Sequence, residues 1–244
     1  EDIGSQCYKY GCKSVTVSHR TNPIGFDWPD NWAEVPLLTK VDGNTAYFKD
    51  GSSRDVDAII LCTGYQHYFP FLTDDLRLKT DNRLWPLGLY KGVVWEENPK
   101  MMYLGMQDQF YTFNMFDAQA WFARDVIMGR IPLPSKDEMK ADSKAWRDRE
   151  EGLKDDHDMI WFQGDYTAHL IEMTDYPMFD IEGVNKTFEE WEHDKADDIM
   201  GYRNKSYRSL MTGNMSPAHH TPWLEELDDS LEAYLQIEKK TAAE

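Results

Sequence analysis

The chain has 244 residues, of which 41% are hydrophobic and nine are Trp, so it can form one large or two modest globular domains. A formal net charge of −18 argues against a nucleic-acid backbone as partner, and no apolar run is long enough to cross a membrane. The three cysteines, Cys7, Cys12 and Cys62, lack metal-type spacing, which argues against disulfides and zinc and fits a reducing cytoplasm.

The first residues predict a short helix followed by a strand. Asp2 to Tyr10 has helical spacing and is closed by Gly11, and Lys13 to Ser18 then alternates like a strand. This order is the second half of a βαβ unit, whose first strand and glycine-rich phosphate turn would precede the helix. No GxGxxG motif occurs in the sequence, so we expect the chain to be the C-terminal part of a longer polypeptide.

The tripeptide His19-Arg20-Thr21 follows that strand. In a doubly wound domain this position faces the adenosine ribose, where an acidic residue accepts from a 2′-hydroxyl and an arginine suits a 2′-phosphate. Arg20 therefore points to NADPH over NADH. The alternative is an ordinary solvated arginine after a strand, and position alone favours neither.

Two turn signals predict a small antiparallel excursion after residue 36. They are Asp42-Gly43-Asn44 and Lys49 to Ser52, and they bound the short β-type runs Leu37 to Val41 and Thr45 to Phe48.

The apolar run Val56 to Leu61 predicts a buried strand that breaks at Thr63-Gly64. A glycine there lets the backbone approach a phosphate or a ring closely, and such strand ends are where open α/β sheets bind cofactors. Aromatic-rich loops begin at Phe69, and Pro70 cannot continue a central strand, so we place a domain crossover near residue 72.

Beyond the crossover the pattern predicts two strands and several helices. The strands are Gly92 to Trp95 and Met101 to Gly105, and a helix follows from Asn114 to Met128, ended by Gly129. Apolar residues at helical spacing predict the core-facing stripe of that helix, namely Phe116, Ala120, Ala123 and Ile127. Ser135 to Glu138 is a capping box that opens another helix. Three more helices are expected, at Asp165 to Met173, Lys186 to Met200 and about Trp223 to Ile237.

Four stretches carry a resemblance to a known family. LCTGYQHYFPFL (61–72) resembles the Thr-Gly signature of flavin-containing monooxygenases, which joins their nicotinamide-binding domain to their flavin-binding domain. Within that family the bacterial trimethylamine monooxygenases are the group most similar to GSQCYKYG (4–11), GMQDQFYTFNMFDAQAW (105–121) and YRSLMTGNMSPAHHTPW (207–223). The resemblance extends over nearly the whole chain.

This resemblance implies an α/β fold class, the flavoprotein architecture of two dinucleotide-binding, Rossmann-like domains, of which only the C-terminal part is present. Residues 1–71 would be the C-terminal portion of the NADPH-binding domain, and residues 72–244 that of the FAD-binding domain. The cofactors would be FAD and NADPH, and a homodimer is implied. The implied cofactor-binding residues in the first portion are His19, Arg20, Thr21, Thr63 and Gly64.

The segment Gly105 to Asn114 precedes a predicted helix, whose first-turn amides stabilise an electron-rich group such as a reduced flavin. The resemblance assigns flavin contacts to Gln109 and Thr112, and it places Asp108 at the catalytic site, near the nicotinamide and the substrate. The alternative role for Asp108 is a helix N-terminal charge, worth about 1 kcal/mol or less.

Aromatic faces attract a methylated ammonium at ~0.5 to 2 kcal/mol each. Candidates for such an enclosure are Trp191, Tyr65, Tyr111 and Phe110, and only the resemblance singles out Trp191 as a catalytic-site residue. The alternative for each is core packing, the commoner fate of aromatic side chains.

Two further C-terminal features are candidate sites. The resemblance implies that Arg203 reaches the nicotinamide cofactor, whereas from its position it is equally an exposed arginine at a helix end. His219 and His220 are adjacent on the backbone, so their side chains diverge, and we expect no metal. The sequence has no nucleophile elbow, P-loop or HExxH, which leaves hydrolase and kinase functions without support.

The resemblance implies NADPH- and O2-dependent N-oxygenation of trimethylamine to trimethylamine N-oxide through a C4a-hydroperoxyflavin, in an enzyme that needs the N-terminal half of its own polypeptide. Two alternatives stay open. One is a related flavin monooxygenase that acts on other amines, sulfides or ketones. The other is a non-catalytic fragment that binds NADP or a partner subunit.

Overall fold

The computed structural model describes residues 1–64 and 66–216, which form two compact units. The first unit contains residues 1–62 and 193–207 together with 215 and 216, and the second contains Thr63–Glu192 and Arg208–Asn214. The chain passes from one unit to the other after Cys62, inside helix α5 (Ile181–Asp197), after Tyr207 and after Asn214. The assignment of residues 1–71 and 72–244 to NADPH- and FAD-binding domains stays a prediction.

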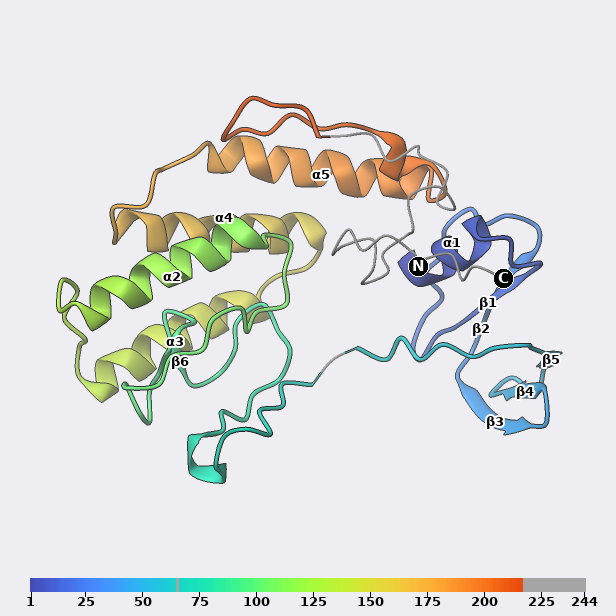
Figure 1. The fold of residues 1–244 in the computed structure, drawn as a ribbon, viewed down its shortest axis with the longest axis horizontal. Helices are drawn as coiled ribbons and strands as arrows, with labels where there is room; N and C mark the ends of the chain where they lie inside the picture. Colours follow the sequence, from blue (N-terminus) through green and yellow to red (C-terminus); the bar gives the residue numbers. More distant parts are fainter. Residues whose placement is uncertain (65, 217–244) are drawn as a thin grey trace, which may run out of the picture. The chain divides into compact units, whose positions relative to one another are not determined.

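The first unit is built on a helix and a parallel pair of strands (Figure 1). Helix α1 (Asp2–Lys9) leads to β1 (Val15–Ser18), which pairs in parallel with β2 (Trp32–Val35). The predicted helix and first strand are confirmed, whereas β2 was missed. Helix α1 packs so close to β2 that a Cβ added to Gly4 would lie 2.9 Å from the Trp32 ring.

A three-stranded antiparallel sheet completes this unit. Its order is β3-β4-β5, and the two turns between its strands are those that the sequence predicted. The strands are β3 (Leu38–Asp42), β4 (Thr45–Phe48) and β5 (Ser53–Asp55). Val35, Ala46 and Phe48 form a small buried cluster beneath it.

The predicted buried strand from Val56 to Leu61 is wrong. The segment forms no strand, and Ile59, Ile60 and Leu61 are 45%, 58% and 78% exposed. An apolar run of this kind becomes a central strand only when neighbouring strands pair with it on both sides. Among the residues that the structure describes, none forms a strand pairing with this run, although the Val56 amide donates to the Asn44 carbonyl at 2.8 Å.

Four helices dominate the second unit (Figure 1). They are α2 (Phe113–Ile127), α3 (Lys136–Glu151), α4 (Asp156–Glu172) and the first part of α5. The predicted capping box is confirmed. The Ser135 side chain accepts from the Glu138 amide, and the Glu138 carboxylate accepts from the Ser135 amide. Helix α4 begins nine residues earlier than predicted because Asp155 caps it, its side chain accepting from the Asp158 amide at 3.0 Å.

The strands of the second unit are shorter than predicted. β6 (Leu89–Tyr90) pairs with β7 (Val94–Trp95), and the second expected strand, Met101 to Gly105, is reduced to a single bridge between Met102 and Val94. Two 3₁₀ turns, Asp74–Leu76 and Tyr202–Asn204, complete the described elements. The helix expected near Trp223 to Ile237 lies outside the described residues.

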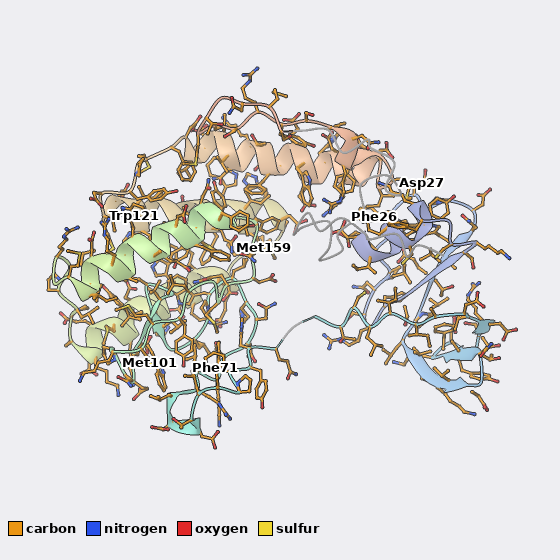
Figure 2. The ribbon with its side chains drawn as sticks, in the orientation of Figure 1. Phe26, Asp27, Phe71, Met101, Trp121 and Met159 are labelled. Atoms are coloured by element: carbon orange, nitrogen blue, oxygen red, sulfur yellow. The ribbon has the colours of Figure 1, made fainter. Side chains whose placement is uncertain are left out.

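The core of the second unit lies among α2, α3 and α4, where side chains fill the space between the helices (Figure 2). Trp85 is fully buried and stacks on Trp146, with ring centroids 5.0 Å apart. The predicted core stripe of α2 is half right: Ala123 is buried and Phe116 packs against the core, whereas Ala120 and Ile127 are exposed. The buried residues of α2 are Met115, Ala118, Gln119, Phe122, Ala123 and Asp125. The apolar spacing did not show that the polar Gln119 and Asp125 face inward. In the described part of the chain, no helix combines the length and apolarity that a membrane span requires.

Candidate functional site

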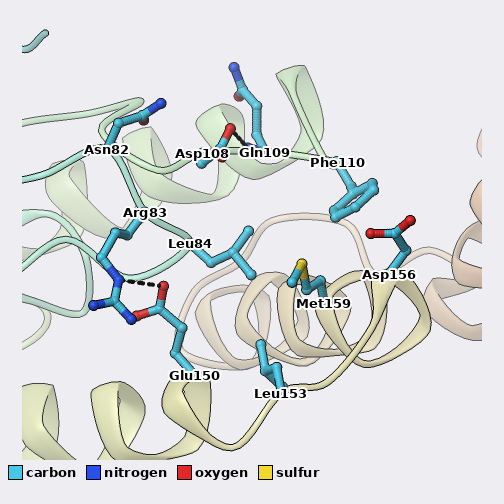
Figure 3. A pocket seen from close by; sticks show the side chains of 10 residues that line it. All are labelled: Asn82, Arg83, Leu84, Asp108, Gln109, Phe110, Glu150, Leu153, Asp156 and Met159. Carbon is cyan, nitrogen blue, oxygen red and sulfur yellow. Dashed lines mark hydrogen bonds and ion pairs between the residues drawn. The ribbon is translucent and has the colours of Figure 1, made fainter. Parts of the chain in front are cut away.

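A pocket of about 480 Å³ opens in the second unit, beside the segment that precedes α2 (Figure 3). Three residues that the sequence singled out, Asp108, Gln109 and Phe110, lie along it. The other lining residues come from the loop before β6 and from α3, α4 and their connection: Asn82, Arg83, Leu84, Glu150, Leu153, Asp156 and Met159. The pocket therefore combines an apolar floor with charged side chains from distant parts of the chain.

Of the three carboxylates that line this pocket, one is held in ion pairs with the described residues and two are not. Glu150 is 9% exposed and is paired with Arg83 at 3.1 Å, as Figure 3 shows, and with Arg147 at 3.0 Å. Asp108 and Asp156 are exposed, and their carboxylates make no ion pair with the described residues. The lining suits a small molecule with an apolar body and a positive charge, because apolar contacts and uncompensated carboxylates lie together.

Gln163 on α4 fixes the backbone of the segment that carries Asp108. Its fully buried side chain accepts from the amides of Phe110 at 2.7 Å and Tyr111 at 3.1 Å, and it donates to the Asp108 carbonyl at 2.5 Å. One neutral amide thus satisfies three backbone groups in a row. Gln163 was not predicted from the sequence, where its only signal is a polar residue on the inward face of an amphipathic helix.

A second buried network holds the residues just upstream. Gln119 accepts from the Gly105 amide at 2.8 Å and donates to Gln107 at 2.8 Å and to the Tyr166 hydroxyl at 3.1 Å. The Tyr166 hydroxyl donates to the Lys91 carbonyl at 2.8 Å, and its burial raises the pKa of this phenol above its ordinary value. The segment 105–111 is therefore held to the core by neutral polar side chains along its length.

Gly92 is required where this network passes β6 and β7. It has φ +65°, and an added Cβ would lie 2.3 Å from Gln107 Nε2 and 2.6 Å from Tyr166 Oη. Both side chains are buried and hydrogen-bonded, so neither has room to move aside.

The start of α2 fits an electron-rich ligand group. Thr112 is its N-cap residue, yet the Thr112 side chain makes no capping hydrogen bond, and both Thr112 and Gln109 are exposed. The uncapped first turn leaves N–H donors and a positive field, and the two exposed polar side chains add donors beside it. These residues fit the polar atoms of a flavin, so the predicted contacts of Gln109 and Thr112 stay as a prediction that the local chemistry supports.

Asp108 lies in the pocket lining and not in the first turn of α2. Its carboxylate accepts from the Gln109 amide at 3.1 Å, and its own amide donates to the Arg83 carbonyl at 2.8 Å. The alternative role as a helix N-terminal charge therefore has less geometric support than the role of a pocket acid.

The structure separates the aromatic candidates. Tyr111 is 1% exposed, and its hydroxyl donates to Asn185 at 2.7 Å, which makes it a core residue. Phe110 lines the pocket and lies edge-on to Phe188, with centroids 6.5 Å apart. Trp191 is half-buried on α5, one turn after Phe188, and Tyr65 lies outside the described residues.

In the first unit, Arg20 and Thr21 are exposed directly after β1, and Arg20 forms no ion pair with the described residues. His19 is half-buried; its amide donates to the Val35 carbonyl at 2.9 Å, and its Nδ1 is buried without a hydrogen-bond partner. An exposed arginine without an ion pair, followed by an exposed hydroxyl, fits a phosphate group.

The remaining predicted residues have different surroundings. Thr63 and Gly64 are exposed at the boundary between the units, and Gly64 has φ +80°. Arg203 donates to Asp2 at 2.5 Å; burial opposes ionisation of Asp2, but the guanidinium outweighs it and holds the pKa of that carboxyl below its ordinary value. His219 and His220 lie outside the described residues, and within the described ones no cluster of potential ligands could hold a metal ion.

Comparisons with known proteins identify what this chain is similar to. Residues 34–178 match the model of a family described as flavin-binding monooxygenase-like. Trimethylamine monooxygenase of Roseovarius sp. strain 217 is 66% identical over 236 residues, 97% of this chain and 53% of the relative. The protein of the same name from Methylocella silvestris is 61% identical over 244 residues, 100% of this chain and 54% of the relative.

A solved structure agrees with these relatives. The crystal structure of Tmm from Pelagibacter sp. strain HTCC7211 superposes with a TM-score of 0.87 at 56% identity, covering 96% of this chain and 53% of that chain. The match supports the predicted α/β flavoprotein fold class. The chain spans about half the length of the curated relatives it matches.

Proposed function

Because the chain belongs to the flavin-binding monooxygenase-like family, we propose that the complete protein converts trimethylamine to trimethylamine N-oxide with NADPH and O2. The observation that carries this proposal is the high sequence identity to relatives named trimethylamine monooxygenase. The overall reaction consumes trimethylamine, O2, NADPH and one proton, and it yields trimethylamine N-oxide, water and NADP+. A bound FAD would supply the redox chemistry of oxygen transfer.

The residues of this chain would bind and orient the reactants. In the first unit Arg20, aided by His19 and Thr21, would bind the 2′-phosphate of NADPH. The exposure of Arg20 and Thr21 supports this role, as does the absence of ion pairs of Arg20 within the described residues. Thr63 and Gly64 would form the connection between the two domains. Arg203, whose guanidinium pairs with Asp2 here, would reach the nicotinamide cofactor.

The second unit would supply the flavin side of the site. Gln109 and Thr112 would donate to the flavin, and Asp108 would lie near the nicotinamide and the amine. Trp191 would present an aromatic face to the substrate. The exposed carboxylates of Asp108 and Asp156 would attract the protonated amine, which is the main form of a tertiary amine at neutral pH.

The test uses the protein at its full natural length. Flavin bands in its visible spectrum, trimethylamine-stimulated oxidation of NADPH, and one ¹⁸O atom from ¹⁸O2 in the N-oxide product are the expected results. Thioethers and ketones in the same assay test the related substrate classes. A colourless protein that binds NADP but does not oxidise NADPH would overturn the proposal and favour the non-catalytic alternative.

A further inference from the structure

Glu34 on β2 holds the loop that follows β1. Its carboxylate accepts from the amide of Ile24 at 2.5 Å, from that of Gly25 at 2.8 Å and from the Trp28 indole at 2.6 Å. Three donors therefore converge on one carboxylate, a geometry typical of a structural anchor.

The two ends of a short segment are fixed on consecutive residues of β2. His19 donates its amide to the Val35 carbonyl at 2.9 Å, and the amides of Ile24 and Gly25 bind the neighbouring Glu34. Residues 20–23 are the bridge between these anchors. Arg20 is the first residue of the bridge, so the two anchors together restrict its backbone although its side chain is exposed.

Aromatic packing makes the rest of the loop rigid. The ring of Trp28 stacks on that of Trp32, with centroids 4.4 Å apart and planes 7° from parallel, and Phe26 lies edge-on to Trp28 at 5.5 Å. Phe26 and Asp27 mark this loop in Figure 2. The indole that donates to Glu34 is thus itself held in place by its stacking partner.

The charge of Glu34 is used inside the loop. Burial opposes its ionisation, but the hydrogen bond from Trp28 and those from the two amides outweigh it, so the pKa of Glu34 lies below its ordinary value. Three donors occupy most of the acceptor capacity of this carboxylate, so it is a weak partner for a ribose 2′-hydroxyl, and its field on a nearby phosphate is reduced.

We propose that Glu34 is a positioning residue for cofactor recognition, which shapes the loop so that Arg20 meets the phosphate of a 2′-phosphorylated adenosine. This inference rests on the proposed function, which assigns that phosphate to Arg20. It adds that discrimination between NADPH and NADH depends on an acidic residue that does not touch the cofactor. Without the hydrogen bonds of Glu34 to the loop, which we call the clamp, Arg20 occupies many positions. Binding of the phosphate then costs the entropy of ordering Arg20.

The test measures binding of 2′,5′-ADP and 5′-ADP by calorimetry, together with kcat and KM for NADPH and NADH, on the protein at full natural length. For Glu34→Gln we expect affinity for 2′,5′-ADP to fall by about tenfold or more, with affinity for 5′-ADP within about twofold of wild type. KM for NADPH should rise while kcat changes little, because the clamp acts on binding and not on the reacting atoms. Glu34→Asp, which keeps the charge on a shorter side chain, should restore part of the loss.

Asp50→Asn is the matched control. Asp50 is an exposed carboxylate in the same unit, and it accepts from the amide and hydroxyl of Ser52 in the β4–β5 turn. This variant should leave both affinities unchanged. If Glu34→Gln does not fold, Trp28→Phe removes one donor to the clamp and keeps an aromatic ring, and it should weaken 2′,5′-ADP binding by about threefold or more.

The outcomes separate this inference from the proposed function. A wild-type protein that binds 2′,5′-ADP no better than 5′-ADP would overturn the assignment of Arg20, and the inference with it. A wild-type protein that discriminates, with folded Glu34→Gln or Trp28→Phe proteins that discriminate equally well, would overturn the role of Glu34 alone.

Discussion

The two loops that carry the proposed cofactor residues are each held by one polar side chain, but these side chains differ in charge and burial. Gln163 is neutral and fully buried, and it binds three backbone groups of residues 108–111. Glu34 is ionised and only half-buried, and it binds two backbone amides and an indole. Burying an amide costs far less than burying a charge, so the core anchor is neutral and the charged anchor lies near the surface.

This contrast predicts different responses to change. Loss of the neutral anchor should act on stability, because the Gln163 side chain is fully buried and its hydrogen bond with the Tyr111 amide is closed to water. Loss of the charged anchor should act mainly on cofactor binding and on the response to pH, because water reaches part of its surroundings.

The largest effect is expected from Gln163→Leu. The substitution leaves two amides and one carbonyl without their partner, at about 1–3 kcal/mol for each buried group, so the free energy of unfolding should fall by roughly 3–5 kcal/mol. Urea denaturation followed by circular dichroism measures it. Gln66→Leu places the same substitution at an exposed site and should change stability by about 0.5 kcal/mol or less. Equal losses in the two variants would contradict the role of Gln163.

Gly92→Ala tests how closely the buried network around Gln107 and Tyr166 is packed. The new Cβ would overlap both side chains, which have no room to move. Gly129→Ala is the control, because Gly129 also has positive φ, +69°, but has nothing within 4 Å of an added Cβ. We expect Gly92→Ala to cost about 2 kcal/mol more than Gly129→Ala in the free energy of unfolding. Similar losses of unfolding free energy in the two variants would mean that the network rearranges to accommodate the added methyl group.

Arg20→Ala tests the function of the loop that Glu34 holds. KM for NADPH should rise by about tenfold or more, while kcat and the KM for NADH stay within about twofold. Arg54→Ala removes an exposed arginine from β5 of the same unit and should leave all three unchanged. If both cofactors are affected equally by Arg20→Ala, the arginine does not read the 2′-phosphate.

The smallest effect is expected in the pH dependence of the stability that the Glu34 carboxylate contributes. Because the folded-state pKa of Glu34 is lowered, its ionisation stabilises the fold above the unfolded value of about 4.3, and this contribution is lost as the pH falls through the folded-state pKa. The gap in melting temperature between wild type and Glu34→Gln should therefore be present at pH 7 and close in acid. His19 also contributes to lowering the pKa of Glu34. A gap of constant size from pH 7 to about 3 would show that the charge is irrelevant.

Local signals in the sequence predicted the elements that depend on neighbours in the chain. The capping box at Ser135, the two turns of the β3-β4-β5 sheet and the helix that Gly11 closes depend on hydrogen bonds and dihedral angles within a few residues. The strand expected from Val56 to Leu61 depends instead on partners distant in the chain, and its prediction from the apolar pattern is wrong.

The site was predicted in part for the same reason. Asp108, Gln109 and Phe110 were found because they lie in one recognisable stretch, and they line one pocket. Glu34 and Gln163 were missed, because a single polar residue in a strand or helix does not reveal which backbone groups it will bind. That information exists only after the chain has folded.

The exposed apolar side chains of Ile59, Ile60 and Leu61 bear on how this polypeptide behaves in a test tube. Extended backbone without a ladder partner, bearing large apolar side chains, is a template for intermolecular β-pairing and aggregation. A preparation in which this run is uncovered should bind hydrophobic dyes and self-associate, faster at high salt, where the repulsion due to the net charge of −18 is screened. A lysine in place of Ile60 would act as a gatekeeper and should slow that association.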